Sequence, residues 1–94
     1  MSTATAIESG TEILFRAIRP SEGDLPPEAS RWLLRIRLSP EDCEKVNRLA
    51  AKARAGTLTA DERSELDEIE RVTSLLELMQ SKARLSLKNS GLSP

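Results

Sequence analysis

The sequence contains no histidine, no tyrosine and a single cysteine, Cys43. Without histidine the chain lacks the commonest general base, proton shuttle and metal ligand. One cysteine excludes an internal disulfide, and it cannot form a zinc site, which needs several Cys or His ligands at fixed spacing. The few glycines are scattered, so there is no glycine-rich phosphate loop. These absences predict a protein that is not an enzyme and that has no cofactor and no metal site.

Long apolar runs are also missing, because no stretch approaches the roughly 18 apolar residues of a membrane span. The first ten residues have neither the basic start nor the apolar core of a secretory signal. The formal net charge is −1, so no overall field favours nucleic acid or anionic lipid. Together with the single cysteine, these features lead us to expect a soluble protein in a reducing cytoplasm, without a membrane partner.

The residues that are present favour helices. Only two Val and five Ile supply β-branched apolar side chains, so a sheet has little to build from. Leu, Ala, Glu and Arg are abundant, and most of these side chains lose little rotamer freedom in a helix. We predict an all-α fold, a small helical bundle with a long antiparallel C-terminal helical hairpin. Its expected parts are a disordered N-terminus (1–8), one helical domain (9–88) and a disordered tail (89–94).

The first half of the chain predicts two short helices. One is expected to start near Ser9 and to stop at Pro20, and the other to open at Pro26. Residues 34–38 (LRIRL) alternate apolar and basic side chains, a pattern that is also typical of a strand. We favour helix there because one isolated strand would have no partner to pair with, and the strand remains the alternative.

The second half predicts a helical hairpin over 40–88. Ser39 is a capping residue before Pro40, and Gly56 supplies the left-handed conformation that ends a helix. Thr59 and Glu62 have the spacing of a capping box at the start of the last helix. The linker between these helices is short, which predicts that they are antiparallel neighbours.

The last helix carries more apolar surface than a short neighbouring helix covers. One apolar seam consists of Ile69, Val72, Leu76, Met79 and Ala83, and an adjoining face of Leu75, Leu78 and Leu85. This excess predicts a surface that binds another chain. The predicted partner-binding residues are Trp32, Ile36, Leu75, Leu78, Met79 and Leu85.

Two single residues have alternative interpretations. Trp32, the only tryptophan, is either the centre of the small core, which we favour, or an interface residue that carries much of the binding energy. Cys43 lies in the first turn of a helix, where a thiol can become reactive. Its place on the apolar seam of that helix favours a small core residue instead.

The charges are unevenly distributed. Residues 61–70 hold six carboxylates and one Arg, which favours a solvated helix start or, alternatively, a surface for a basic partner such as the DNA-binding groove of a nuclease. Asp67 and Arg71 have the spacing of a helix-face ion pair. A patch for phosphates is the competing interpretation of the basic residues Arg35, Arg37, Lys52, Arg54, Lys82, Arg84 and Lys88. Ordinary cationic helix ends are favoured.

Part of the chain, from Leu38 to Lys88, resembles a family of small, largely uncharacterised bacterial proteins. The segments that carry the resemblance are Leu38–Asp42, Ala53–Thr59, Glu65–Leu66, Leu76 and Gln80–Leu85. They are mainly helix caps and seams, so they indicate a hairpin better than a function. Members of the family look like companions of HNH-type endonucleases, which implies a nuclease-associated or antitoxin-like role and assigns no functional residue.

Three functions follow as hypotheses. The first is a non-catalytic protein-binding accessory or antitoxin-like subunit that acts through an apolar helix face, with a nuclease among the possible partners. The second is a nucleic-acid-binding regulator that uses the basic helix ends, and its binding would weaken steeply with salt. The third is a structural module that pairs with itself as a homodimer.

Overall fold

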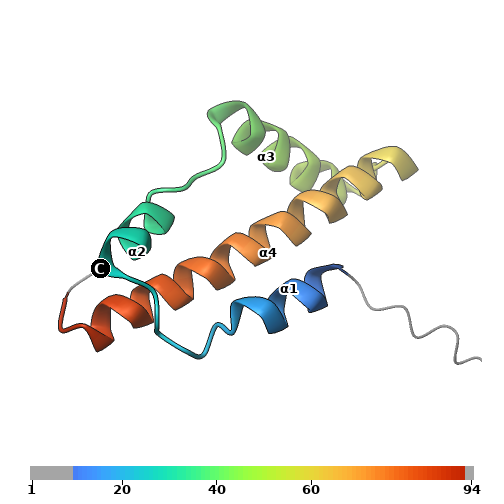
Figure 1. Cartoon of the computed structure of the whole chain (residues 1–94). Helices are drawn as coiled ribbons and strands as arrows, with labels where there is room; N and C mark the ends of the chain where they lie inside the picture. The colour runs from blue at the N-terminus through green and yellow to red at the C-terminus, as the bar shows by residue number, and fades with distance from the viewer. Residues whose placement is uncertain (1–9, 93–94) are drawn as a thin grey trace, which may run out of the picture.

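The computed structural model describes residues 10–92 of the chain, which form four α-helices (Figure 1). They are α1 (Gly10–Ile18), α2 (Pro27–Leu34), α3 (Pro40–Ala55) and α4 (Ala60–Asn89). The described part of the chain contains no strand, so the predicted all-α fold is confirmed. The segment predicted to be disordered at 1–8 lies outside the described residues.

Helix α4 is the longest helix, and the other three helices contact it. Its 30 residues span about 45 Å at 1.5 Å per residue. The backbones of α1, α2 and α3 each approach α4 but not one another (Figure 1). The Cα atoms extend only 17 Å along the shortest axis, which is about the thickness of two packed helices whose axes lie roughly 8–10 Å apart. The molecule is therefore thin, and much of α4 has a neighbour on one side only.

The two short helices begin and end close to the predicted positions. Helix α1 ends at Ile18, where Arg19 takes a left-handed conformation with a φ of 51° just before Pro20. Helix α2 begins at Pro27, with Pro26 in an extended conformation before it. Proline fits the first turn because the backbone N–H that it lacks would have no helical partner there.

Only Leu34 of residues 34–38 is helical, and residues 35–38 are neither the favoured helix nor the alternative strand, so both interpretations of the segment are wrong. Helix α2 ends at Leu34, and irregular backbone follows the turn at Arg35. The Gln80 side chain of α4 donates hydrogen bonds of 3.0 Å to the carbonyl oxygens of Leu33 and Ile36. Because this amide satisfies carbonyl groups at the end of α2, the helix does not need to continue.

The predicted caps of α3 and α4 are confirmed. Ser39 Oγ accepts a 3.1 Å bond from the backbone N–H of Asp42. Gly56 ends α3 with a φ of 71°, and a side chain would be strained in that conformation. At the start of α4, Thr59 Oγ1 accepts from Glu62 N at 3.1 Å, and Glu62 Oε1 accepts from Thr59 N at 3.0 Å.

Helices α3 and α4 form an open pair rather than a closely packed hairpin. They converge at the loop that joins them and diverge toward the start of α3 (Figure 1). Near the loop Leu49 of α3 and Leu66 of α4 are both buried. Cys43 lies near the diverging end and is exposed, so its prediction as a core residue is wrong. A seam of small residues on one helix does not ensure that the neighbouring helix follows it over its whole length.

The C-terminal end of α4 is capped by backbone hydrogen bonds. The helix continues through Asn89, the first residue of the predicted tail, and Gly91 takes a φ of 78°. Gly91 N donates to Lys88 O at 3.0 Å and Leu92 N donates to Leu87 O at 2.8 Å. This pattern is a Schellman motif, which satisfies carbonyl groups in the last turn of the helix.

Candidate protein-binding surface

Few apolar side chains of the described residues are fully buried. They are Leu49, Leu66, Ala83 and Leu87. The first two lie where α3 meets α4, and the last two lie in the C-terminal part of α4, on which α2 packs. The middle of α4 separates these two small cores. A domain of this size has little hydrophobic burial to spare, so apolar residues left outside both cores need explanation.

Five large apolar side chains of the described residues remain exposed: Ile13, Leu14, Trp32, Val72 and Leu92. Trp32 is 58% exposed, so the favoured interpretation of this residue as the centre of the core is wrong. Val72 is 51% exposed although it belongs to the predicted apolar seam. The partner-binding prediction did not include Ile13, Leu14 or Val72. Their exposure depends on where the neighbouring helices end, which no local pattern reveals.

The other predicted partner-binding residues, Ile36, Leu75, Leu78, Met79 and Leu85, are only half-buried. Part of their covering comes from the loop between α1 and α2. This loop approaches α4 at Gly23, where an added Cβ would lie 2.9 Å from Leu85 Cγ. The missing side chain of Gly23 thus lets loop backbone cover the C-terminal part of the predicted face.

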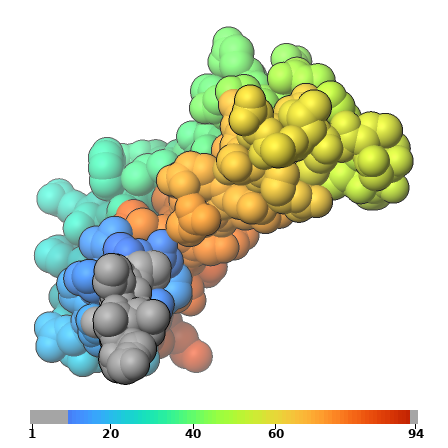
Figure 2. Space-filling view, turned by 90° about the vertical axis from the view of Figure 1, so that its right-hand side faces the viewer, coloured from blue at the N-terminus to red at the C-terminus, as the bar shows by residue number. Residues whose placement is uncertain are grey.

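Two hollows flank Val72 in the middle of α4. The first, of about 500 Å³, lies between α1 and α4 and is lined by Gly10, Thr11, Leu14, Glu68, Arg71, Val72 and Leu75. The second, of about 220 Å³, lies toward α3 and is lined by Leu38, Asp42, Lys45, Glu65, Glu68, Ile69 and Val72. Because they share Glu68 and Val72, we treat them as one surface, the central trough. Figure 2 shows this part of α4, in orange, between α1 in blue and α3 in green.

Charged pairs of both signs line the central trough. Arg71 pairs with Glu68 at 2.6 Å and not with Asp67, so the predicted Asp67–Arg71 pair is wrong. On the side of α3, Lys45 pairs with Glu65 at 2.8 Å. The hydrogen bond from Lys45 to Glu65 raises the pKa of Lys45 above its ordinary value, so this ammonium group stays charged at neutral pH.

One wall of the trough, α1, contains no buried residue of its own, and the buried side chain of Lys82 holds its C-terminal end. Lys82 Nζ donates to the carbonyl oxygens of Ile18 at 2.7 Å and Arg19 at 3.1 Å, and it pairs with Asp24 Oδ1 at 2.7 Å. The hydrogen bond from Lys82 lowers the pKa of Asp24 below its ordinary value, so the carboxylate is ionised at neutral pH.

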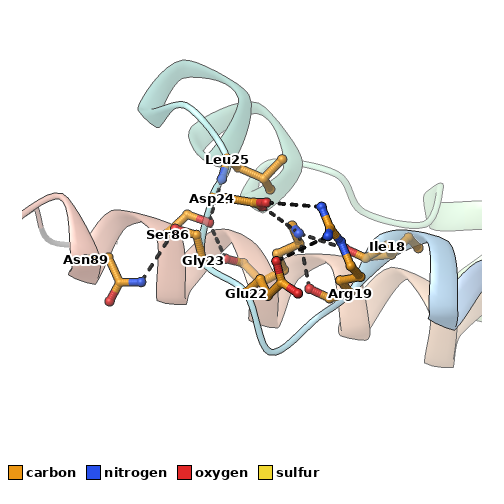
Figure 3. A network of polar contacts seen from close by, with 9 residues as sticks. Ile18, Arg19, Glu22, Gly23, Asp24, Leu25, Ser86 and Asn89 are labelled. Atoms are coloured by element: carbon orange, nitrogen blue, oxygen red, sulfur yellow. Dashed lines mark hydrogen bonds and ion pairs between the residues drawn. The ribbon is translucent and has the colours of Figure 1, made fainter.

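Two more side chains of α4 hold the same loop (Figure 3). Ser86 Oγ accepts from Leu25 N at 3.1 Å and donates to Lys82 O at 2.8 Å. Asn89 Nδ2 donates to Gly23 O at 3.5 Å. We call Asp24, Lys82, Ser86 and Asn89 the loop clamp. It fixes the end of α1 against α4 and so positions the wall that carries Leu14.

The opposite side of α4 is polar. It carries an exposed stripe of polar and charged residues at spacings of three and four: Glu70, Ser74, Glu77, Ser81, Arg84 and Lys88. Such spacing places them on one helix face. A solvated stripe on one face and a trough on another indicate that a partner has one face of α4 to bind.

Several of the basic residues considered as a phosphate patch have other contacts. Lys82 belongs to the loop clamp, and Lys52 pairs with Glu62 at 2.6 Å. The guanidinium group of Arg37 donates to Leu34 O at 2.7 Å and to Ile36 O at 2.8 Å. The two ion pairs neutralise part of the positive charge, and the carbonyl contacts occupy donors that Arg37 would need to bind a phosphate.

Within residues 10–92 no three His, Cys, Asp or Glu side chains gather so that they could hold a metal ion. No helix in that range is long and apolar enough to cross a membrane. A scan against protein-family models, a search of curated proteins and a search of solved structures each found no match. The central trough is therefore the feature of the structure that bears on function.

Proposed function

We propose that this protein is a non-catalytic protein-binding subunit, an accessory or antitoxin-like chain, that binds its partner through the central trough. The observation that carries the proposal is the exposure of Val72, at 51%, in the middle of the longest helix. Hollows lie on both sides of it, and apolar side chains line both. A concave apolar surface with a charged rim is typical of a site that receives side chains of another protein.

Covering this surface would release enough free energy to contribute to binding. Fully burying a Val, Leu or Ile side chain is worth about 1.5–3 kcal/mol. Because Leu14 and Val72 are already about half covered, a partner would gain roughly 1 kcal/mol from each. The half-buried Leu75 would add to this. Such a sum supports binding only when the partner also fits the hollows and the charges around them.

The charged residues of the trough favour binding over chemistry. Four of the five charged residues that line it, Glu68, Arg71, Lys45 and Glu65, are engaged in ion pairs. The fifth, Asp42, has no histidine to act with as an acid–base pair, because the sequence contains none. Both hollows are open to water, whereas catalytic sites commonly exclude it.

A photocrosslinking amino acid placed at position 72 tests this proposal in the cells that make the protein. We expect irradiation to join the chain to another protein chain from position 72. The matched control places the same amino acid at Glu77 on the polar stripe, where we expect no adduct. Equal adduct yields at the two positions, or none at position 72, would overturn the proposal.

A further inference from the structure

The shape of the central trough is self-complementary. Val72 projects between two hollows, of about 500 and 220 Å³, and lines both of them. When a copy of this surface is turned to face it, the Val72 side chain of each copy can enter a hollow of the other. A projecting side chain beside a hole is the packing unit of many helix–helix interfaces.

The charges beside Val72 are self-complementary as well. Glu68 and Arg71 carry opposite charges, lie less than one helical turn apart and are both exposed. A twofold axis through the trough brings the same patch of each copy against the other. Glu68 of one copy can then face Arg71 of the other, so that each ion pair gains a second partner.

The position of the trough on α4 fits a dimer that leaves no surface for a third copy. Val72 and Leu75 lie near the middle of α4, which runs from Ala60 to Asn89. Helices α2 and α3 cover its two ends, so two copies can cross at the centre of α4. The polar stripe on the opposite face leaves no equivalent apolar surface on α4 for a third copy.

From shape, charge and position we infer that the occupant of the central trough is a second copy of this chain, in a twofold-symmetric dimer. The inference rests on the proposed function and specifies its partner. Glu68 and Arg71 are the residues that select the second copy, whereas Val72, Leu14 and Leu75 supply the apolar contact.

Sedimentation equilibrium of the purified chain is the first test. The expected mass is twice the 10.4 kDa of one chain. Glu68→Arg alone puts two Arg side chains opposite each other, and Arg71→Glu alone does the same with two carboxylates. Each variant should raise the dissociation constant of its own homodimer by about tenfold or more. The matched controls Glu77→Arg and Arg84→Glu make the same charge changes on the polar stripe and should leave the constant unchanged.

Mixing the two trough variants is the decisive step. The Glu68→Arg chain is basic at both positions and the Arg71→Glu chain is acidic at both, so an equimolar mixture should dimerise although each alone does so poorly. Circular dichroism identifies variants that are still helical before mixing. A wild-type chain that stays monomeric, or a mixture no more associated than its components, would overturn the inference.

These outcomes are separate from failure of the proposed function. If the purified chain is monomeric and position 72 still crosslinks to a different protein in cells, the second copy is the wrong partner and the protein-binding role stands. If position 72 forms no adduct in cells, both proposals fail.

Discussion

The two ends of α4 are held by different kinds of contact. At the C-terminal end Ala83 and Leu87 are fully buried, and the buried Lys82 bonds to loop backbone. Near the N-terminal end Leu49 of α3 and Leu66 of α4 are buried. Toward the middle of α4, α3 diverges, and part of the contact there consists of ion pairs between partly exposed side chains, such as Lys45–Glu65. The C-terminal part of α4 is therefore covered by loop backbone as well as by a helix, whereas the middle of α4 remains available to a partner.

The largest expected effect is on the C-terminal core. Replacing Leu87, which is 0% exposed, by alanine removes buried methyl groups and leaves a cavity. Substitutions of this kind cost about 2–5 kcal/mol in the free energy of unfolding. Leu92→Ala, at a leucine that is 38% exposed and follows the same helix, is the control and should cost less, at most about 1 kcal/mol. Urea denaturation followed by circular dichroism measures both, and equal losses would contradict the comparison.

The next largest effect concerns the loop clamp. Lys82→Met keeps the apolar stem but removes the ammonium group, so two carbonyl groups and Asp24 lose their donor. Breaking a buried ion pair costs about 3–5 kcal/mol, and because Asp24 is half exposed we expect about 2 kcal/mol. Lys88→Met, at an exposed lysine of the same helix, should have little effect. Thermal unfolding compares the two variants.

The dependence of the free energy of unfolding on acidic pH tests the ion pair between Lys82 and Asp24 in the same clamp. The pKa of Asp24 is lowered in the folded state, so its ordinary value of 3.8 belongs to the unfolded chain. The stability that the ion pair contributes is therefore present above pH 3.8 and is lost as the pH falls through the lower folded value. The Lys82→Met variant should lack this part of the acid dependence. An unchanged acid limb would show that the ion pair adds nothing.

A smaller effect, a gain in the free energy of unfolding, is expected from a substitution at Ser30 between α2 and α4. The Ser30 hydroxyl is fully buried and has no hydrogen-bond partner in the described structure. Replacing it by alanine removes a desolvated polar group, so the free energy of unfolding should rise by about 1 kcal/mol. Ser81→Ala, at an exposed serine of α4, should leave stability within about 0.5 kcal/mol. A loss of stability in Ser30→Ala would mean that the hydroxyl has a partner in solution.

The smallest effect is expected at the N-terminal end. Lys45→Met removes the Lys45–Glu65 pair, in which both side chains are more than a third exposed. Exposed ion pairs contribute little to stability because water and salt screen them. The midpoint of thermal unfolding should therefore stay within experimental error of the wild-type value. A drop as large as that of Lys82→Met would remove the distinction between the two ends.

Local features of the fold were predictable from sequence, and tertiary ones were not. The caps at Ser39, Gly56 and Thr59 depend on residues within one turn, and all three are confirmed. Trp32 and Cys43 were assigned to the core because they lie on apolar helix faces. Both are exposed, because their exposure depends on where neighbouring helices lie.

In the candidate site, too, the local feature was predictable from sequence and the tertiary one was not. The sequence predicted an apolar surface on α4, and Leu75 is the only predicted partner-binding residue that lines the central trough. The position of the trough depends on α1, which is held by Lys82. Two of the partners of Lys82 are backbone carbonyl groups more than sixty residues away in the sequence. No side-chain pattern in the sequence encodes such contacts, so neither the clamp nor the trough could be located from it.

The central claim is that two copies meet at Val72, and thiol labelling tests it most directly. Cys43 is exposed, so the probe is introduced as Val72→Cys in a Cys43→Ser background, with Glu77→Cys in the same background as control. We expect a water-soluble thiol reagent to label position 72 more slowly as the protein concentration rises, and to label position 77 at a constant rate. Labelling of position 72 at the same rate from the lowest to the highest concentration would contradict the claim.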